Sequence, residues 1–333
     1  MKVICFSSHG FELTYLEEQA KKQGLEVCLI QAQLNKDTAS LASGYQAISC
    51  WANDDLSGEV LVKLKELGVQ YISLRTAGFS HVDRKTCESL DIRVARVPAY
   101  SPEAIAEHTL GLLMCLNRKF PRAFQRVKDF NYTLDGLEGL TLFGKNVGVI
   151  GLGKIGIAFA RIMKGMGCNL FFYDVKQDSQ IANELNATYT GLEELLRTSD
   201  IVSLHCPLNS QTRYLLNSQT LSFMKKDAFL LNTGRGGLIE TAALIEKLKK
   251  KELRGVGLDV YEYEENLFFH DHSEEGITDE MLLRLMGFPN VLITSHQAFL
   301  TKEALVNIAQ VSMENVFCFL KGLPIDPARI VTS

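Results

Sequence analysis

The sequence lacks the features of a membrane-spanning or exported protein. No run of about 18 apolar residues occurs, and an apolar segment at residues 3–6 begins too early for a signal peptide. Eight cysteines are scattered without a CxxC pair, and several lie in apolar segments, such as Cys5, Cys28, Cys115 and Cys168. We therefore expect reduced cysteines in a cytoplasmic protein with no disulfide framework.

The chain also lacks an excess of positive charge. Its net charge is −4, and its longest basic run, residues 249–251, is typical of an exposed helix end. We therefore expect no nucleic-acid partner and no membrane partner. Short repeats and low-complexity segments are absent as well. The 333 residues, 46% of them hydrophobic, indicate two globular domains with ample cores.

One stretch carries the clearest pattern in the chain. Residues 147–150 are apolar and β-branched enough for a buried strand, and the glycine turn 151–156 (GLGKIG) follows them. Apolar residues then recur at helical spacing until Gly167 ends the helix. A second apolar strand, 169–173, leads into Asp174. The pattern predicts one βαβ unit.

The glycine turn predicts a dinucleotide site. Gly151 permits a tight turn, Gly153 leaves room for a pyrophosphate, and Gly156 allows close packing of helix and strand. The helix N-terminus offers free N–H groups to phosphates. Asp174 can accept hydrogen bonds from ribose hydroxyls and would repel a 2′-phosphate, which favours NAD over NADP. A six-residue glycine turn of this kind also occurs in ordinary α/β proteins. The strands on both sides of it and the acid Asp174 favour the interpretation as a cofactor site.

Strands and helices alternate along the whole chain, which predicts parallel sheets covered by helices. The pattern indicates two doubly wound, Rossmann-like α/β domains, one inserted in the other, with the active site between them. A polar segment at 264–278 predicts a long loop. We expect strands at 3–6, 27–30, 47–50, 71–74, 93–97, 147–150, 169–173, 200–205, 229–232, 255–259 and 291–294, and helices at 12–23, 61–67, 82–90, 103–118, 157–166, 192–196, 241–251 and 301–320.

Three polar residues follow predicted strand ends, where doubly wound sheets bind ligands: Arg235, Glu264 and His296. An arginine can grip a carboxylate, and a histidine can exchange a proton near neutral pH. A glutamate beside the histidine would orient it and favour its charged form. With a nicotinamide cofactor, this set suits reduction of a 2-keto acid. Because Glu262, Glu264 and Glu265 lie together, the pattern alone does not select Glu264.

Other histidines have simpler interpretations. His108, next to Glu107 on an apolar helix, is more typical of a buried hydrogen-bonded pair than of catalysis. His205 closes a strand, so we expect it to be structural or to line the cofactor site. His270 and His272 could indicate a metal site, but no third ligand accompanies them. We therefore expect no metal.

The sequence resembles the D-isomer-specific 2-hydroxyacid dehydrogenases, and most closely the fermentative D-lactate dehydrogenases. The resemblance covers essentially the whole chain and rests on segments in the order found in that family. These segments are LRTAGFSHVD (74–83), RVPAYSPEAIAEHTLGL (96–112), GVIGLGKIG (148–156), SLHCPL (203–208), NTGRGGLI (232–239), GLDVYEYE (257–264) and SHQAFLTKEAL (295–305).

The resemblance implies a role for each matching residue. Arg235 corresponds to the arginine that binds the substrate carboxylate and keto oxygen, His296 to the general acid/base, and Glu264 to its partner. Among the substrate-binding residues, Ala77 and Gly78 would bind the carboxylate through backbone N–H groups, and Tyr100 and Phe299 would line the pocket. The cofactor-contacting positions are Gly151, Gly153, Lys154, Ile155, Gly156, Asp174, Cys206, Pro207, Thr212, Thr233, Gly234 and Asp259.

The resemblance also implies an activity and an organisation. Expected are NADH-dependent reduction of pyruvate to D-lactate and a homodimer or a dimer of dimers. A substrate domain of residues 1–100 and 299–333 would enclose an NAD-binding domain of residues 101–298. Bulky Tyr100 and Phe299 indicate a small substrate pocket. Two alternatives stay open: the same chemistry on a larger 2-keto acid, and a protein that senses NAD(H) by binding it.

Overall fold

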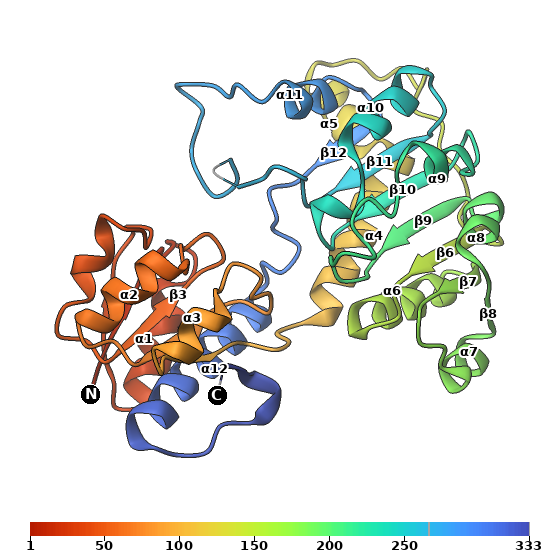
Figure 1. The fold of residues 1–333 in the computed structure, drawn as a ribbon. Coiled ribbons are helices and arrows are strands. Elements are labelled where there is room, and N and C mark those ends of the chain that lie inside the picture. The colour runs from red at the N-terminus through yellow and green to blue at the C-terminus, as the bar shows by residue number, and fades with distance from the viewer. Residues whose placement is uncertain (266, 333) are drawn as a thin grey trace. The chain divides into compact units, whose positions relative to one another are not determined.

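The computed structural model describes residues 1–265 and 267–332 (Figure 1). Its backbone divides into two compact units. Unit 1 consists of Met1–Ser101 together with the residues from Leu300 onward, and unit 2 is Pro102–Phe299. The chain therefore leaves unit 1, completes unit 2 and returns to unit 1.

Unit 1 is built on a six-stranded sheet with the order β13-β5-β4-β3-β1-β2. Five strands are parallel, and β13 is antiparallel to β5 at the edge. The strands are β1 (Lys2–Cys5), β2 (Glu26–Leu29), β3 (Ala47–Cys50), β4 (Tyr71–Leu74), β5 (Arg93–Ala95) and β13 (Ile330–Thr332). The helices are α1 (Leu13–Lys22), α2 (Gly58–Glu66), α3 (Arg84–Ser89) and α12 (Lys302–Lys321), with 3₁₀ turns η1 (Thr38–Ala42) and η3 (Pro327–Arg329).

Both faces of this sheet are buried, because side chains alternate across each strand. Val3 and Cys5 of β1 pack with α1 and α12, for example against Met313. Ile4, between them in sequence, packs with α2 on the opposite face, in the cluster that contains Leu61. The apolar strands thus form the middle layer of a three-layer domain.

Unit 2 is built on a seven-stranded parallel sheet with the order β12-β11-β10-β9-β6-β7-β8. The strand order reverses between β9 and β6, as in dinucleotide-binding domains. The strands are β6 (Asn146–Ile150), β7 (Asn169–Tyr173), β8 (Ala187–Tyr189), β9 (Ile201–Leu204), β10 (Phe229–Asn232), β11 (Gly255–Leu258) and β12 (Val291–Ile293).

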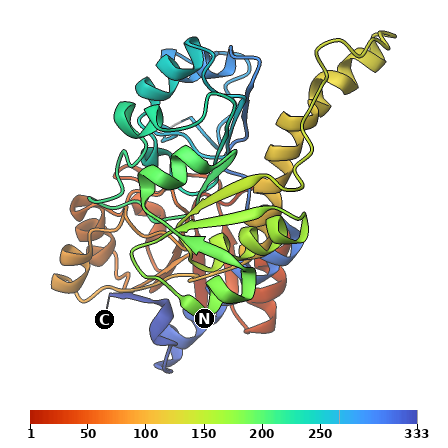
Figure 2. The same ribbon diagram turned by 90° about the vertical axis from the view of Figure 1, so that its right-hand side faces the viewer.

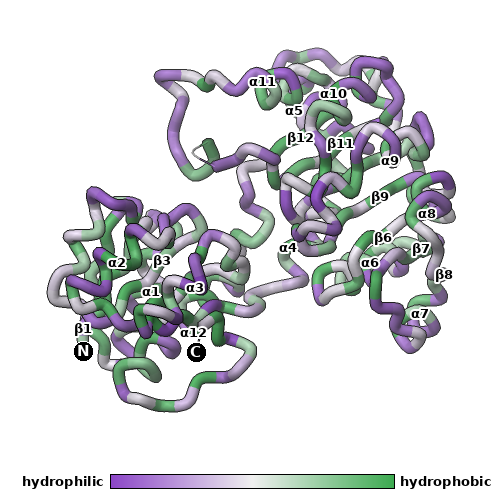
Figure 3. The backbone as a smooth tube through the Cα atoms, viewed as in Figure 1, coloured by the Kyte–Doolittle hydropathy of each residue, from purple (hydrophilic) through white to green (hydrophobic). Residues whose placement is uncertain are grey.

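The helices of unit 2 cover both faces of its sheet (Figures 1 and 2). On one face Leu113 and Phe159 pack against Val149 and Leu231, and on the other Leu196 and Leu244 join a second cluster. Figure 3 shows hydrophobic residues along the strands and hydrophilic residues in many of the connections. The helices are α4 (Pro102–Arg118), α5 (Phe120–Lys128), α6 (Lys154–Gly165), α7 (Ser179–Leu185), α8 (Leu192–Thr198), α9 (Ser218–Ser222), α10 (Thr241–Lys249) and α11 (Glu280–Met286), with the 3₁₀ turn η2 (Gly236–Leu238).

The expected doubly wound fold is confirmed, but several short elements were not predicted. These are β8, β13, α5, α7, α9 and α11. The described residues between 264 and 278 contain no helix or strand, and Asn266 lies outside the described residues. All eight cysteines are free; Cys5 and Cys168 are buried, whereas Cys28 and Cys115 are partly exposed. None of the described helices has the length and apolarity to cross a membrane.

A buried ion pair lies at the carboxyl edge of the unit 1 sheet. Arg75, directly after β4, is fully buried, and its Nε lies 3.1 Å from Glu12 Oε2. The guanidinium also donates to Ser49 Oγ (3.1 Å) and to the carbonyl oxygens of Phe6 (2.5 Å) and Ser7 (3.1 Å). Because every contact is intramolecular, the pair ties the ends of three strands together.

We predict that Glu12→Gln destabilises unit 1 by about 3–5 kcal/mol, because it leaves the Arg75 charge buried without a counterion. Urea unfolding followed by the fluorescence of Trp51, the only tryptophan and a buried residue of unit 1, measures this change. Glu59→Gln is the control, since the pair between Glu59 and Lys36 is exposed and its loss will change stability little. Equal effects of the two substitutions would contradict the prediction.

Candidate active site

The parallel strands of unit 2 bring most of the expected site residues to one edge of the sheet. Because parallel strands end at the same edge, residues that directly follow adjacent strands lie beside one another. From one side of the sheet to the other, these are His296 after β12, Asp259 after β11, Arg235 after β10, Cys206 after β9, Gly151 after β6 and Asp174 after β7.

The glycine turn after β6 is sterically restricted at two positions. Gly151 has φ +94°, and a Cβ there would lie 2.4 Å from the backbone nitrogen of Cys206. A Cβ on Gly156 would lie 2.0 Å from the carbonyl oxygen of Gly151. Gly153 differs, because nothing lies within 4 Å of its Cβ position. A side chain at Gly151 or Gly156 would therefore collide with the backbone of the protein itself, whereas Gly153 leaves open space over the turn.

The residues at this turn fit a dinucleotide. Helix α6 begins after Gly153 without a side-chain cap, and the N–H groups of Lys154, Ile155 and Gly156 donate to no described residue. Such free donors at a helix N-terminus bind phosphate groups. Asp174 is half-buried and accepts the Leu152 N–H at 2.5 Å. A carboxylate has further acceptor positions, which ribose hydroxyls can occupy.

The expected cofactor residues after β9 form a folded loop. Cys206 packs its backbone against Gly151, and burial raises the pKa of its thiol to about 11, so the thiol is neutral near pH 7. Thr212 Oγ1 donates to the carbonyl oxygen of Pro207 at 2.6 Å. The Thr212 hydroxyl therefore shapes the loop, and its contact with a cofactor stays a prediction.

Thr233 and Gly234 follow β10. Thr233 Oγ1 lies 2.8 Å from Thr109 Oγ1 of α4, and both residues are buried. The Gly234 N–H donates to Asn232 Oδ1 at 3.0 Å. Both residues are held by the chain in a turn that ends at Arg235.

His296 and Glu264 are in direct contact. His296 Nδ1 lies 2.7 Å from Glu264 Oε1, and both side chains are roughly three-quarters buried. The second carboxylate oxygen of Glu264 accepts the Tyr261 N–H at 2.8 Å. Glu264 is therefore fixed on one side by the backbone and holds the imidazole on the other, which leaves Nε2 of His296 outside this contact.

The neighbouring acid Glu262 has different partners. Its carboxylate accepts the Tyr214 hydroxyl and, at 3.0 Å, the Thr241 N–H. Burial would raise the pKa of Glu262, but these hydrogen bonds outweigh it and lower the pKa. Of the acids that the sequence pattern could not separate, Glu264 is thus the one on the histidine.

The backbone of His296 adopts a left-handed conformation, with φ +53°. A non-glycine residue occupies this region only where its surroundings hold it. The His296 N–H donates to the Asp259 carbonyl at 2.7 Å. The Asp259 carboxylate accepts the N–H groups of Gln297 and Ala298, each at 2.9 Å. Asp259 therefore holds the turn that presents the imidazole.

Asp259 is itself held by a buried network. Thr294 Oγ1 donates to its Oδ1 at 2.6 Å, and His108 Nε2 of α4 lies 3.4 Å from the same oxygen. Burial would raise the pKa of Asp259, but hydrogen bonds from His108, Thr294 and Ala298 outweigh it and lower the pKa. We expected a cofactor contact at Asp259. The described structure shows its carboxylate hydrogen-bonded to residues of this chain, and a contact with the cofactor stays a prediction. His108 pairs with Thr294 and Asp259, not with Glu107.

Arg235 lies in the turn after β10, the strand next to β11. It is exposed, and among the described residues its guanidinium forms no ion pair, donating only to the Gly234 carbonyl at 2.7 Å. A Cβ on the next residue, Gly236, would lie 2.1 Å from the Tyr261 carbonyl group. The loop of Arg235 therefore lies directly against the loop that carries Glu264.

Ala77, Gly78 and Tyr100 lie in unit 1. The carbonyl oxygens of Ala77 and Gly78 accept hydrogen bonds from Arg96 (2.7 Å) and Thr76 (2.8 Å). The N–H groups of Ala77 and Gly78 donate to no described residue. Tyr100 is half-buried and Phe299, the last residue of unit 2, is buried.

Three further histidines considered from the sequence are His205, His270 and His272. His205 Nε2 lies 2.8 Å from Ser203 Oγ, and burial lowers the pKa of His205 to about 3, so it is neutral near pH 7. The rings of His270 and His272 are 6.1 Å apart. Within residues 1–265 and 267–332, no three His, Cys, Asp or Glu side chains come together as a metal site.

The fold and this edge define a dinucleotide-binding protein with a histidine–glutamate contact and, after the next strand but one, an arginine that forms no ion pair among the described residues. Residues 110–298 match the family model of the D-isomer specific 2-hydroxyacid dehydrogenase, NAD binding domain. The chain belongs to this family. It is therefore an NAD-dependent oxidoreductase of 2-hydroxyacids.

Similar proteins cover nearly the whole chain. It is 44% identical to D-lactate dehydrogenase of Escherichia coli, over 97% of this chain and 98% of that protein. It is also 44% identical to a 2-hydroxyacid dehydrogenase homolog of Haemophilus influenzae, over 97% of each chain. A solved structure described as the pyruvate reductase of Chlamydomonas reinhardtii has a TM-score of 0.92 and 41% identity, covering 97% of each chain.

Sequence reasoning missed the support beneath the site. The role of Asp259 depends on His108, which is distant in sequence, and on the left-handed backbone at His296. The sequence does show a histidine on an apolar helix and an acid at a strand end. Neither residue indicates which side chain it contacts in the fold.

The glycines of the turn give a paired prediction. Gly156→Ala will destabilise unit 2 by about 1–3 kcal/mol or more, because its methyl group collides with the Gly151 carbonyl. Gly153→Ala will leave stability unchanged but weaken NADH binding about tenfold, since the methyl group enters the open space over the turn. Thermal unfolding and NADH titration measure both. A stable Gly156→Ala variant, or full NADH affinity in Gly153→Ala, would contradict this interpretation.

Proposed function

We propose that this protein reduces pyruvate to D-lactate with NADH, using His296 as general acid and Arg235 as the carboxylate-binding residue. The observation that carries the proposal is the 2.7 Å contact between His296 Nδ1 and Glu264 Oε1. A carboxylate on one ring nitrogen fixes the orientation of the imidazole. The other nitrogen can then donate its proton to a keto oxygen.

Substrate binding requires donors for a carboxylate. Arg235 has an exposed guanidinium without an ion pair among the described residues, and guanidinium groups bind carboxylates bidentately. The N–H groups of Ala77 and Gly78 donate to no described residue and would supply further donors. We assign unit 1 as the substrate domain on this ground, and unit 2 as the NAD-binding domain.

Gly151, Gly153 and Gly156 and the N-terminus of α6 would hold the pyrophosphate of the cofactor, and Asp174 its ribose. Bound NADH supplies the hydride that the keto carbon accepts. His296 supplies the proton to the keto oxygen, so that pyruvate, NADH and one proton give lactate and NAD⁺. Glu264 keeps the imidazole oriented through this transfer, and Arg235 holds the carboxylate.

Two considerations favour pyruvate over larger 2-keto acids. Bulky side chains at Tyr100 and Phe299 favour a small pocket. Similar proteins at high coverage include a D-lactate dehydrogenase and a structure described as a pyruvate reductase. We further propose that the protein acts in the cytoplasm and as a homodimer or a dimer of dimers, as the family resemblance implies.

The general acid gives a direct prediction. His296→Gln will lower kcat for pyruvate reduction by roughly 10²–10⁴-fold, the usual contribution of acid–base catalysis. Its NADH affinity will change little, because the substitution leaves the glycine turn intact. Steady-state kinetics and NADH fluorescence titration measure the two effects, and full turnover in the variant would refute the assignment.

The two neighbouring acids give a matched pair of variants. Glu264→Gln will lower kcat for pyruvate reduction, because His296 loses the carboxylate that orients its imidazole. Glu262→Gln will leave kcat in place, since the Glu262 carboxylate binds Tyr214 and Thr241. Steady-state kinetics of the two variants distinguish them. An unchanged kcat in Glu264→Gln would contradict the proposed role.

A further inference from the structure

Arg96 is a half-buried cation beside the loop that is proposed to bind the substrate carboxylate. It directly follows β5, and its Nη1 donates to the Ala77 carbonyl oxygen at 2.7 Å. Among the described residues, Arg75 and Arg329 of unit 1 pair with glutamates, whereas Arg96 forms no ion pair. A partly buried charge without a counterion is costly. An anion bound near Arg96 would therefore be stabilised.

The carbonyl of Ala77 and the N–H of Gly78 belong to the same peptide group. A trans peptide is planar, and its carbonyl and N–H point in opposite directions. The Arg96 guanidinium therefore lies on one side of this group, and the Gly78 N–H, which donates to no described residue, points to the other side. Because hydrogen bonds in series polarise one another, a cation on the carbonyl makes the N–H a stronger donor.

The neighbouring carbonyls of the loop are also occupied. The Val97 N–H donates to the Thr76 carbonyl at 3.1 Å, in the peptide group whose N–H belongs to Ala77. The Thr76 hydroxyl donates to the Gly78 carbonyl at 2.8 Å. The carbonyls of residues 76–78 are thus bound within the chain, while the N–H groups of Ala77 and Gly78 remain for a ligand. Of the donors to these carbonyls, Arg96 alone carries a charge.

Arg96 is held in place by the C-terminal part of the chain and by an aromatic ring. Its N–H donates to the Arg329 carbonyl at 2.8 Å, and its own carbonyl accepts Asn315 Nδ2 of α12 at 3.2 Å. Its Cζ lies 5.0 Å from the centroid of the Phe79 ring, within the range of a cation–π contact. These contacts restrict the guanidinium to the loop 76–79.

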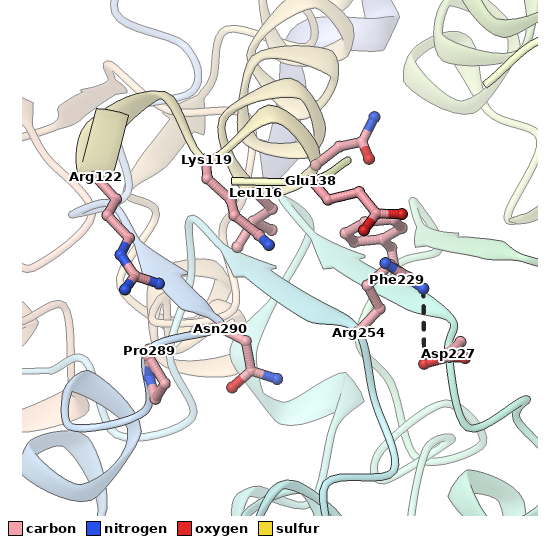
Figure 4. Close-up of a pocket in the computed structure, with 10 residues that line it drawn as sticks. Leu116, Lys119, Arg122, Glu138, Asp227, Phe229, Arg254, Pro289 and Asn290 are labelled. Atoms are coloured by element: carbon pink, nitrogen blue, oxygen red, sulfur yellow. Dashed lines mark ion pairs between the residues drawn. The ribbon is translucent and has the colours of Figure 1, made fainter. Parts of the chain in front are cut away.

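Arg254 of unit 2 shows the opposite arrangement. It directly precedes β11 and lines a hollow of about 340 Å³ together with Asp227 and Glu138 (Figure 4). Its Nη2 lies 3.9 Å from Asp227 Oδ1. The acids in this hollow offset its positive charge for an incoming anion, whereas Arg96 has no ion-pair partner among the described residues.

We propose that Arg96 is a positioning residue for the substrate carboxylate, acting through the peptide group that joins Ala77 to Gly78. It fixes the direction of the Gly78 N–H, strengthens that donor and places a positive charge behind it. The inference rests on the proposed function, because it requires an anionic substrate at this loop. In that proposal Arg235 contacts the carboxylate directly, whereas Arg96 acts through the backbone.

The proposed role has a kinetic signature. The carboxylate does not change during reduction of the keto group, so Arg96 stabilises the bound substrate and the transition state about equally. Loss of its charge therefore raises KM and leaves kcat nearly unchanged. Loss of the proton donor His296 would have the opposite signature, a lower kcat.

Arg96→Met tests the proposal, because methionine removes the charge but can still pack on the Phe79 ring. KM for pyruvate will rise about tenfold or more, through the loss of one charge-assisted interaction, and kcat will change little. The inhibition constant of oxamate, an unreactive carboxylate similar in size to pyruvate, will rise by the same factor. NADH titration will give the wild-type affinity, because the glycine turn is intact.

Two further variants serve as comparison. Arg96→Lys keeps the charge and will recover part of the loss, since lysine supplies a point charge without the planar fork of arginine. Arg93→Met is the matched control, because it removes an equal charge from the beginning of β5, where the guanidinium lies over the rings of Tyr71 and Phe319. This control will leave KM and oxamate inhibition unchanged.

The results separate failure of the inference from failure of the proposed function. With a wild type that reduces pyruvate, an unchanged KM in Arg96→Met would overturn the inference alone. A lower kcat without a change in KM, an equal effect of Arg93→Met, or no recovery in Arg96→Lys would do the same. A wild type that neither reduces a 2-keto acid nor binds oxamate would overturn the proposed function and the inference with it.

A second substitution covers the case in which Arg96→Met does not fold, as judged by far-UV circular dichroism. Arg96→Gln also removes the charge but keeps an N–H donor for the Ala77 carbonyl. A raised KM and oxamate inhibition constant with nearly unchanged kcat in this variant support the proposal. Wild-type values of both constants would overturn it, because the charge would then have no part in binding the carboxylate.

Discussion

The carboxylate of Asp259 is the constraint on which the site depends. It is buried at the end of β11 and accepts two backbone N–H groups from the turn after β12. That turn contains His296 in a left-handed conformation, which local sequence does not favour. Because Thr294 and His108 hold the carboxylate in turn, the position of the imidazole is determined by the core of unit 2 and by helix α4.

The site combines rigid support with unused donors. Glu264 and His296 are held by each other and by the backbone, so the proposed proton donor is in place before substrate binds. By contrast, the Arg235 guanidinium forms no ion pair among the described residues, and the N–H groups of the first turn of α6 donate to no described residue. These groups suit the anionic carboxylate and pyrophosphate of an NAD-dependent 2-hydroxyacid oxidoreductase. Preorganised groups of this kind lower the cost of binding and of proton transfer.

The sequence predicted what depends on local pattern. Apolar strands, the glycine turn and polar residues at strand ends follow from spacing within a few residues, so the doubly wound fold and the edge of the sheet with Arg235, Glu264 and His296 were predictable. Short elements such as β13 and β8 were missed, because three residues carry too little pattern. The choice of Glu264 over Glu262 needed the resemblance, since only the fold shows that Tyr214 and Thr241 occupy Glu262. The support from His108 to Asp259 joins distant segments, which no local pattern reveals.

The most direct test of the account is NADH consumption by the purified protein with pyruvate, a series of larger 2-keto acids, and NADPH as the control. The account predicts strong turnover with pyruvate and NADH, weak turnover with NADPH because of Asp174, and D-lactate as the product by chiral chromatography. Faster turnover of a larger 2-keto acid would retain the mechanism and change the substrate. Tight NADH binding without turnover of any 2-keto acid would contradict the roles proposed for Arg235 and His296.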